Sequence, residues 1–209
     1  AAREWIERRF PRDGILGEEF GLVRPEARRR WILDPIDGTK SFVRGVPLWG
    51  TLVAVVEGER VLAGAMAFPA VAEHVAAAPR QGCWWNGTRC RVSEVASLDA
   101  ALILTTDPKF GARPERRAAW QALEDAAGLS RSWADCYGYL LVATGRAEVM
   151  TDAIVGDWDT AALQPIVEEA GGVFTDWAGR PTAFGGSAIA TNAALASEVR
   201  RRLGVPAAG

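Results

Sequence analysis

The sequence contains little histidine and little cysteine. Its 209 residues include one histidine, His74, and three cysteines, Cys83, Cys90 and Cys136. His74 lies in an alternating stretch typical of a strand surface, so we do not expect a Ser-His-Asp or Cys-His mechanism. No cysteine belongs to a CxxC pair or stands at metal-binding spacing from the histidine. We therefore expect three buried, reduced thiols in a cytoplasmic protein.

Long apolar runs are also absent, and the net charge is small. No run approaches the roughly 18 residues that a membrane span requires, and no signal peptide is visible. The formal net charge is −2, without the strong basic patch of a nucleic-acid-binding protein. The arginine runs at 28–30 and 200–202 are short and fit solvated faces. We therefore expect neither nucleic acid nor a membrane as partner.

Hydrophobic periodicity divides the chain into two halves of one compact unit, with predicted boundaries at 1–97 and 98–209. The first half completes a short helix near residue 10 and continues as an antiparallel meander, whose last hairpin turns at Asn86-Gly87. The second half alternates strands and helices, which predicts an α+β half joined to an α/β half in layers. We predict strands at 31–34, 48–58, 60–70, 101–107, 147–153, 173–181 and 187–192, and helices at 39–45, 114–128, 135–146, 159–172 and 193–203.

Acidic residues follow several of the apolar runs. They are Glu18 and Glu19 in GILGEEFG, Asp34 and Asp37 in WILDPIDGTKSF, and the pair Asp157 and Asp159. Carboxylate oxygens are preferred ligands of Mg²⁺, and a site with this many suits two or more ions that clamp a phosphoryl displacement. Gly38 and Thr39 begin a predicted helix, where backbone N–H groups and a hydroxyl can receive phosphate.

Each of these residues also has a purely structural interpretation. The two glutamates suit a solvated turn, Asp34 and Asp37 suit a turn before a helix, and Asp159 is a good N-cap. Lys40 suits an exposed surface as well as a place near a phosphate. Metal binding is favoured because acids recur after apolar runs, with Asp-Gly-Thr behind one of them.

Three segments resemble, in order, the signature motifs of the inositol monophosphatase family: GEE at 17–19, WILDPIDGTKSF at 31–42 and GDWDTAAL at 156–163. AGAMAFPA, the Asn86-Gly87 hairpin and EEAGGVFTD are similar to elements between them, so the resemblance covers nearly the whole chain. It implies a layered αβαβα sandwich and Mg²⁺-dependent hydrolysis of a small phosphate ester. Members open with two antiparallel helices, and the resemblance implies that these helices, with an acid that pairs with Thr39, are missing before Phe10.

The resemblance also implies roles for single residues. Two or three Mg²⁺ ions would be bound by Glu18, Asp34, Asp37, Asp159 and the backbone carbonyl of Ile36. The ions would activate water for direct attack on the phosphate, without a covalent enzyme intermediate. Gly38 and Thr39 would hold the phosphate, with Thr39 contributing to catalysis, and Glu19 would lie behind the metal ligands.

The residues that face the leaving group would choose the substrate. Asp135 stands where inositol-type members carry a small residue, and Asp152 and Asp159 match acids that contact substrate in the family. Two further acids suit a cationic alcohol, and DGTKSFVRGVPLWGT, LTTDP and DCYGYLLVATGRAEVM are similar to the histidinol-phosphatase branch. We expect L-histidinol phosphate as substrate. The structural alternative for Asp135 is an N-cap of its helix.

Alternatives remain open at the level of function. The chain could be an inositol 1-phosphate or related phosphatase of the same family, or an inactive member that binds only metal or a partner. A structural protein with acidic turns is a third alternative. An exposed Trp84-Trp85 pair at the hairpin would supply a contact for a homodimer.

Overall fold

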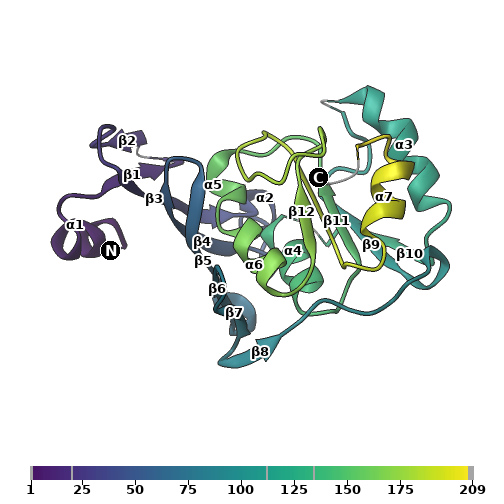
Figure 1. Ribbon diagram of the computed structural model, residues 1–209, viewed down its shortest axis with the longest axis horizontal. Coiled ribbons are helices and arrows are strands. Elements are labelled where there is room, and N and C mark those ends of the chain that lie inside the picture. The colour runs from purple at the N-terminus through teal and green to yellow at the C-terminus, as the bar shows by residue number, and fades with distance from the viewer. Residues whose placement is uncertain (1, 20, 112, 134, 207–209) are drawn as a thin grey trace.

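Two sheets, separated by a layer of helices, form most of the computed structural model (Figure 1). It describes residues 2–19, 21–111, 113–133 and 135–206. Within these ranges the first sheet has eight strands in the order β2-β1-β3-β4-β5-β6-β7-β8, and the second has five in the order β10-β9-β11-β13-β12. No helix in the described part of the chain is long and apolar enough to cross a membrane.

The first sheet contains the predicted meander. Its strands are β1 (Gly14–Gly17), β2 (Gly21–Val23), β3 (Arg29–Asp37), β4 (Gly50–Glu57), β5 (Arg60–Phe68), β6 (Glu73–Ala78), β7 (Gly82–Trp85) and β8 (Thr88–Cys90). From β3 to β8 each strand pairs antiparallel with the next along the chain. Asn86 and Gly87 have φ values of 46° and 79°, as the predicted type I′ turn requires. His74 is exposed, and all three cysteines are buried and free, as expected.

The second half supplies the other sheet and most of the helices. Its strands are β9 (Leu102–Thr105), β10 (Leu129–Arg131), β11 (Val149–Asp152), β12 (Val173–Thr175) and β13 (Ala188–Thr191). The helices α4 (Cys136–Ala143), α5 (Asp157–Thr160) and α6 (Leu163–Glu169) lie between the sheets, and α3 (Pro114–Glu124) and α7 (Ala196–Arg202) cover the second sheet from outside (Figure 1). The remaining helical elements are α1 (Ala2–Arg9), α2 (Thr39–Phe42), η1 (Pro69–Val71) and η2 (Leu98–Ala100).

These elements form the predicted αβαβα layers. The outermost helical layer is represented by α1, whose Trp5 packs edge-on against Trp31 of β3 with 6.4 Å between ring centroids. The main hydrophobic cluster fills the space between the sheets and includes Leu52 of β4 and Leu140 of α4. Gly64 of β5 permits a close approach of the helical layer to the first sheet, because a Cβ there would overlap the backbone at Ala162, between α5 and α6.

Two elements predicted in the second half were clearly too long. The helix predicted at 159–172 is interrupted between α5 and α6, because Pro165 has no N–H to donate to the carbonyl four residues earlier. The strand predicted at 173–181 ends at Thr175, where the chain turns through Asp176. The strands β1, β2 and β10 were not predicted, since three or four residues are too few to show a period of two.

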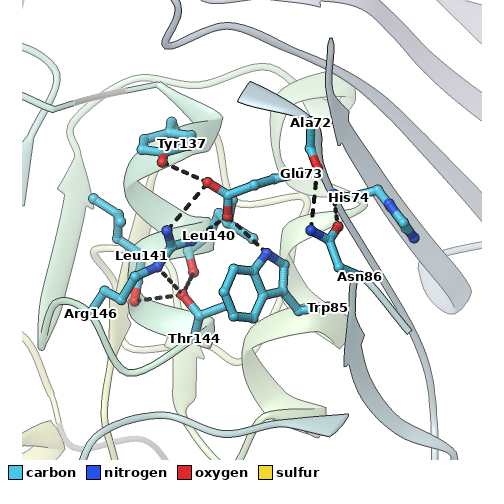
Figure 2. A network of polar contacts seen from close by, with 10 residues as sticks. All are labelled: Ala72, Glu73, His74, Trp85, Asn86, Tyr137, Leu140, Leu141, Thr144 and Arg146. Atoms are coloured by element: carbon cyan, nitrogen blue, oxygen red, sulfur yellow. Dashed lines mark hydrogen bonds and ion pairs between the residues drawn. The ribbon is translucent and has the colours of Figure 1, made fainter. Parts of the chain in front are cut away.

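A polar network joins β6, β7 and α4 (Figure 2). Glu73 accepts hydrogen bonds from the Tyr137 hydroxyl at 2.9 Å and from Trp85 Nε1 at 2.8 Å, and pairs with Arg146 at 2.7 Å. Burial opposes ionisation of Glu73, but the hydrogen bonds from Arg146, Tyr137 and Trp85 outweigh it and lower the pKa of the carboxyl. Trp85 is therefore held inward, whereas Trp84 is 46% exposed. The network fastens α4 to the first sheet.

Replacing Glu73 with Gln should lower the free energy of unfolding by about 2 kcal/mol, because three donors would then compete for one amide oxygen in a largely buried place. Chemical denaturation measures this loss. The control is Glu57→Gln, which breaks a surface pair with Arg28, whose side chain is 88% exposed. That change should cost less than about 1 kcal/mol, and equal losses would contradict the importance of the network.

Candidate active site

Asp34 and Asp37 lie on β3, which has a bulge between them. Asp34 pairs with Leu52 and Asp37 with Gly50, so β3 carries one more residue here than β4. Pro35 lies inside the bulge, where its missing N–H costs no ladder hydrogen bond. The predicted end of this strand at Asp34 was therefore wrong. The strand continues, and the extra residue returns both aspartates to the same face of the sheet.

Asp159 joins these two residues from α5. One carboxylate oxygen from each of Asp34, Asp37 and Asp159 lies within 4.8 Å of the others, so the group could hold a metal ion. Asp34 is 1% exposed, and the other two are partly exposed. Three oxygen donors of one charge, close together at the end of a strand, fit the ligand preference of Mg²⁺.

Backbone N–H groups hold each of the three carboxylates. The donors are Ile36 to Asp34 at 2.9 Å, Cys136 to Asp37 at 2.9 Å and Gly156 to Asp159 at 2.7 Å. The last bond gives Asp159 a capping role as well, at the start of α5. Burial raises the pKa of all three carboxyls, and neighbouring acids raise the pKa of Asp34 and Asp37 further. Among the described residues no ion pair neutralises the group, so a bound cation fits its charge.

Glu18 and Glu19 lie beside this group rather than within it. Glu18 follows β1, which pairs parallel with β3, and its N–H donates to the Leu33 carbonyl at 3.3 Å. This pairing places Glu18 next to Asp34, and its charge contributes to the raised pKa of Asp34. Both glutamates and Asp34 line a hollow of about 260 Å³.

Gly38 and Thr39 form the turn from β3 into α2. Gly38 has a φ of 84°, and a Cβ there would lie 3.0 Å from the Leu48 carbonyl oxygen and 3.2 Å from Oδ2 of Asp135. Glycine is therefore required both by the backbone and by the close approach. The Thr39 hydroxyl donates to the Ile36 carbonyl at 3.0 Å, which brings together two groups that sequence reasoning assigned to phosphate and metal.

A second hollow, of about 90 Å³, brings the predicted substrate acids to the metal candidates. Asp135 and Asp152 line it together with Asp37 and Asp159. Asp152 is 7% exposed, and its two oxygens accept hydrogen bonds from the Thr106 N–H at 3.1 Å and from the Tyr139 hydroxyl at 2.9 Å. Burial raises the pKa of Asp152 to about 6, although hydrogen bonds from the Thr106 side chain, the Thr106 N–H and the Tyr139 hydroxyl oppose the rise.

Asp135 immediately precedes α4. It has the N-cap position, but its side chain makes no capping hydrogen bond, and the Cys136 N–H goes to Asp37 instead. Burial raises the pKa of Asp135, and the charge of Lys40 opposes this rise, so Lys40 lies on the same side of the site. Ala134, in the same segment, lies outside the described residues.

Sequence reasoning missed Thr106 and Tyr139. Thr106 directly follows β9, and the register of β9 and β11 pairs Thr105 with Thr151, which places Thr106 beside Asp152. The signal was the LTTDP segment after a buried strand, because the carboxyl ends of neighbouring parallel strands meet at one edge of a sheet. Tyr139 is fully buried inside an apolar helix, and its sequence gave no signal of a polar role.

Comparison with known proteins places the chain among phosphatases. The model of the inositol monophosphatase family matches residues 1–203. The chain belongs to this family. The fold agrees, since an inositol monophosphatase from Zymomonas mobilis superposes with a TM-score of 0.89 at 33% identity, over 97% of this chain and 79% of that one. Family membership makes the protein a metal-dependent phosphatase of small phosphate esters, and the acidic group is a place where it could hold a metal ion.

The relatives differ in their named substrates. A histidinol-phosphatase from Chlorobaculum parvum is 44% identical, over 90% of this chain and 72% of the relative. Another, from Mycobacterium tuberculosis, is 40% identical, over 96% of this chain and 79% of the relative. A fructose-1,6-bisphosphatase/inositol-1-monophosphatase from Thermotoga maritima is 35% identical, over 93% of this chain and 74% of the relative.

Replacing Asp152 with Asn should change how stability depends on pH. The carboxyl has a pKa of about 6 in the folded protein against a usual value of 3.8, so the folded state binds more protons between these values. Wild-type stability should therefore fall as the pH rises from 4 to 7, by roughly 3 kcal/mol from this group. Asn does not ionise, so the variant should gain that amount relative to wild type. Urea denaturation of the metal-free proteins tests this, and a constant difference across the range would contradict it.

Proposed function

We propose that the protein hydrolyses L-histidinol phosphate to L-histidinol and phosphate. The supporting observation is the hollow in which Asp135 and Asp152 lie with two of the candidate metal ligands. Acids on the leaving-group side favour a cationic alcohol, and histidinol carries an ammonium and an imidazole group. The similarity to two histidinol-phosphatases supports the same choice.

We infer that the cofactor is Mg²⁺, as two or three ions. The proposed ligands are Asp34, Asp37, Asp159, Glu18 and the carbonyl of Ile36, and Glu19 lies in the hollow behind them. When bound, the ions supply the charge that lowers the pKa of the attacking water and neutralises the leaving oxygen. Gly38 and Thr39 receive the phosphate beside this group, and glycine is required at position 38 because a Cβ would crowd the Leu48 carbonyl and Asp135.

The two substrate acids have different tasks in this proposal. Both oxygens of Asp152 already accept hydrogen bonds from the protein, so Asp152 contributes charge and holds its neighbours rather than binding substrate directly. Asp135 is partly exposed at the edge of the same hollow and can meet the ammonium of the leaving alcohol. Without substrate, Lys40 partly balances the charge of Asp135.

The second candidate is an inositol 1-phosphatase. The Thermotoga maritima relative, whose name includes that activity, favours it. A neutral polyol, however, would leave the charges of Asp135 and Asp152 uncompensated in a partly buried site, which costs free energy.

Phosphate release should be fast with L-histidinol phosphate and slow with inositol 1-phosphate. Asp135→Asn should lower kcat/KM for histidinol phosphate about tenfold, because it removes one charge-assisted contact, and should change inositol phosphate turnover little. Asp125→Asn is a matched control, since the Asp125 carboxylate is exposed, accepts a hydrogen bond from Gln121 of α3 and does not line the hollow. If the protein hydrolysed inositol 1-phosphate but not histidinol phosphate, the proposed substrate would be wrong.

Mg²⁺ should raise the melting temperature of the protein, because it binds the folded state. Asp37→Asn should abolish that rise and reduce kcat about a thousandfold, since the ions contribute several kcal/mol to the reaction. Without Mg²⁺ the variant should melt no lower than wild type, because it relieves crowding among acids. Full activity in Asp37→Asn would show that the ligands are wrongly assigned.

A further inference from the structure

A chain of hydrogen bonds runs from the buried interior to the backbone of Asp135. The Tyr139 hydroxyl donates to Oδ2 of Asp152 at 2.9 Å, and Oδ1 of the same carboxylate accepts from the Thr106 N–H at 3.1 Å. The Thr106 hydroxyl oxygen then accepts from the Asp135 N–H at 3.1 Å. Thr106 therefore connects one substrate acid to the other.

The backbone of Asp135 is strained at the end of this chain. Its φ of 53° and ψ of −152° belong to a region that glycine enters and other residues avoid. Such a conformation persists only where the surroundings fix it. Here two successive N–H groups are fixed, that of Asp135 by Thr106 and that of Cys136 by Asp37.

An acid at this position brings no structural benefit of its own. The Asp135 side chain does not cap α4, burial raises the pKa of its carboxyl, and glycine would adopt the same backbone without strain. What the conformation achieves is a place for the carboxylate, which lines the hollow beside Asp37 and Asp159. Strain at an acid that faces a hollow indicates selection for function rather than for stability.

We propose that Thr106 is a positioning residue for substrate selection. Its hydroxyl holds Asp135 in the strained conformation that turns the carboxylate toward a cationic leaving group, and Asp152 and Tyr139 hold Thr106 in turn. The inference rests on the proposed function, because it is the ammonium of the substrate that Asp135 is there to meet. Thr106 itself is exposed at the end of β9, so this role is separate from packing.

The test compares Thr106→Val, which removes the hydroxyl but keeps the shape and the N–H, with Thr106→Ser, which keeps the hydroxyl. In Thr106→Val the KM for histidinol phosphate should rise about tenfold, as expected for one lost hydrogen bond to a binding group, with kcat within about twofold. Thr106→Ser should restore the wild-type KM. A lower kcat instead would contradict the proposal, because it would indicate a general disturbance of Asp34, Asp37 and Asp159.

Thr182→Val is the matched control. The Thr182 hydroxyl also accepts a backbone N–H, that of Phe184 at 3.0 Å, but Thr182 does not line the hollow. Its loss should leave KM unchanged. An equal rise of KM in both valine variants would overturn the proposal, because it would assign the effect to stability rather than to Asp135.

Amide hydrogen exchange at Asp135, measured by NMR without substrate, tests separately whether Thr106 fixes the Asp135 backbone and whether that matters for substrate selection. Exchange should accelerate in Thr106→Val and stay slow in Thr106→Ser. Unchanged exchange in Thr106→Val would show that the Thr106 hydroxyl does not fix the backbone of Asp135, even if histidinol phosphate is the substrate. Faster exchange with an unchanged KM would overturn its use in selection. A wild-type protein that ignores histidinol phosphate would refute the proposed function, while the exchange result would still decide whether Thr106 holds Asp135.

Discussion

The structure depends on holding three carboxylates together against their mutual repulsion. Asp34, Asp37 and Asp159 lie within reach of a single ion, and burial and neighbouring charge disfavour their ionised forms. The fold partly offsets the repulsion among these carboxylates with three backbone N–H donors, which come from the strand bulge, α4 and the turn before α5. This cost in stability fits a site that could hold a cation.

The bulge in β3 is what allows Asp34 and Asp37 to lie on the same face of the sheet. In a regular strand, residues three apart project to opposite faces, so Asp34 and Asp37 could not share an ion. One extra residue at Pro35 restores both to one face, and the Thr51 hydroxyl donates to the Pro35 carbonyl at 2.8 Å, which gives the bulged backbone a partner. Proline fits there because a bulge needs one donor fewer.

The helix α4 connects this group to the rest of the molecule. Its first N–H binds Asp37, and its Tyr137 hydroxyl binds Glu73 of the first sheet (Figure 2). The residue before it, Asp135, lines the hollow on the substrate side. The three-carboxylate group, Asp135 and the first sheet are therefore all connected to one helix, so a shift of α4 would disturb all of them together.

The sequence by itself determined the meander, the Asn86-Gly87 turn, the family and the three acids that could hold a metal ion, because these depend on local pattern and on motifs contiguous in the chain. The tertiary structure decided what depends on the meeting of distant segments. Parallel register brings Thr106 to Asp152, and the bulge aligns Asp34 with Asp37. Hydrogen bonds to Thr106 and Asp37 fix the strained backbone of Asp135. A local pattern such as LTTDP can point to one partner but does not fix these contacts, since each depends on a pairing between segments far apart in the sequence.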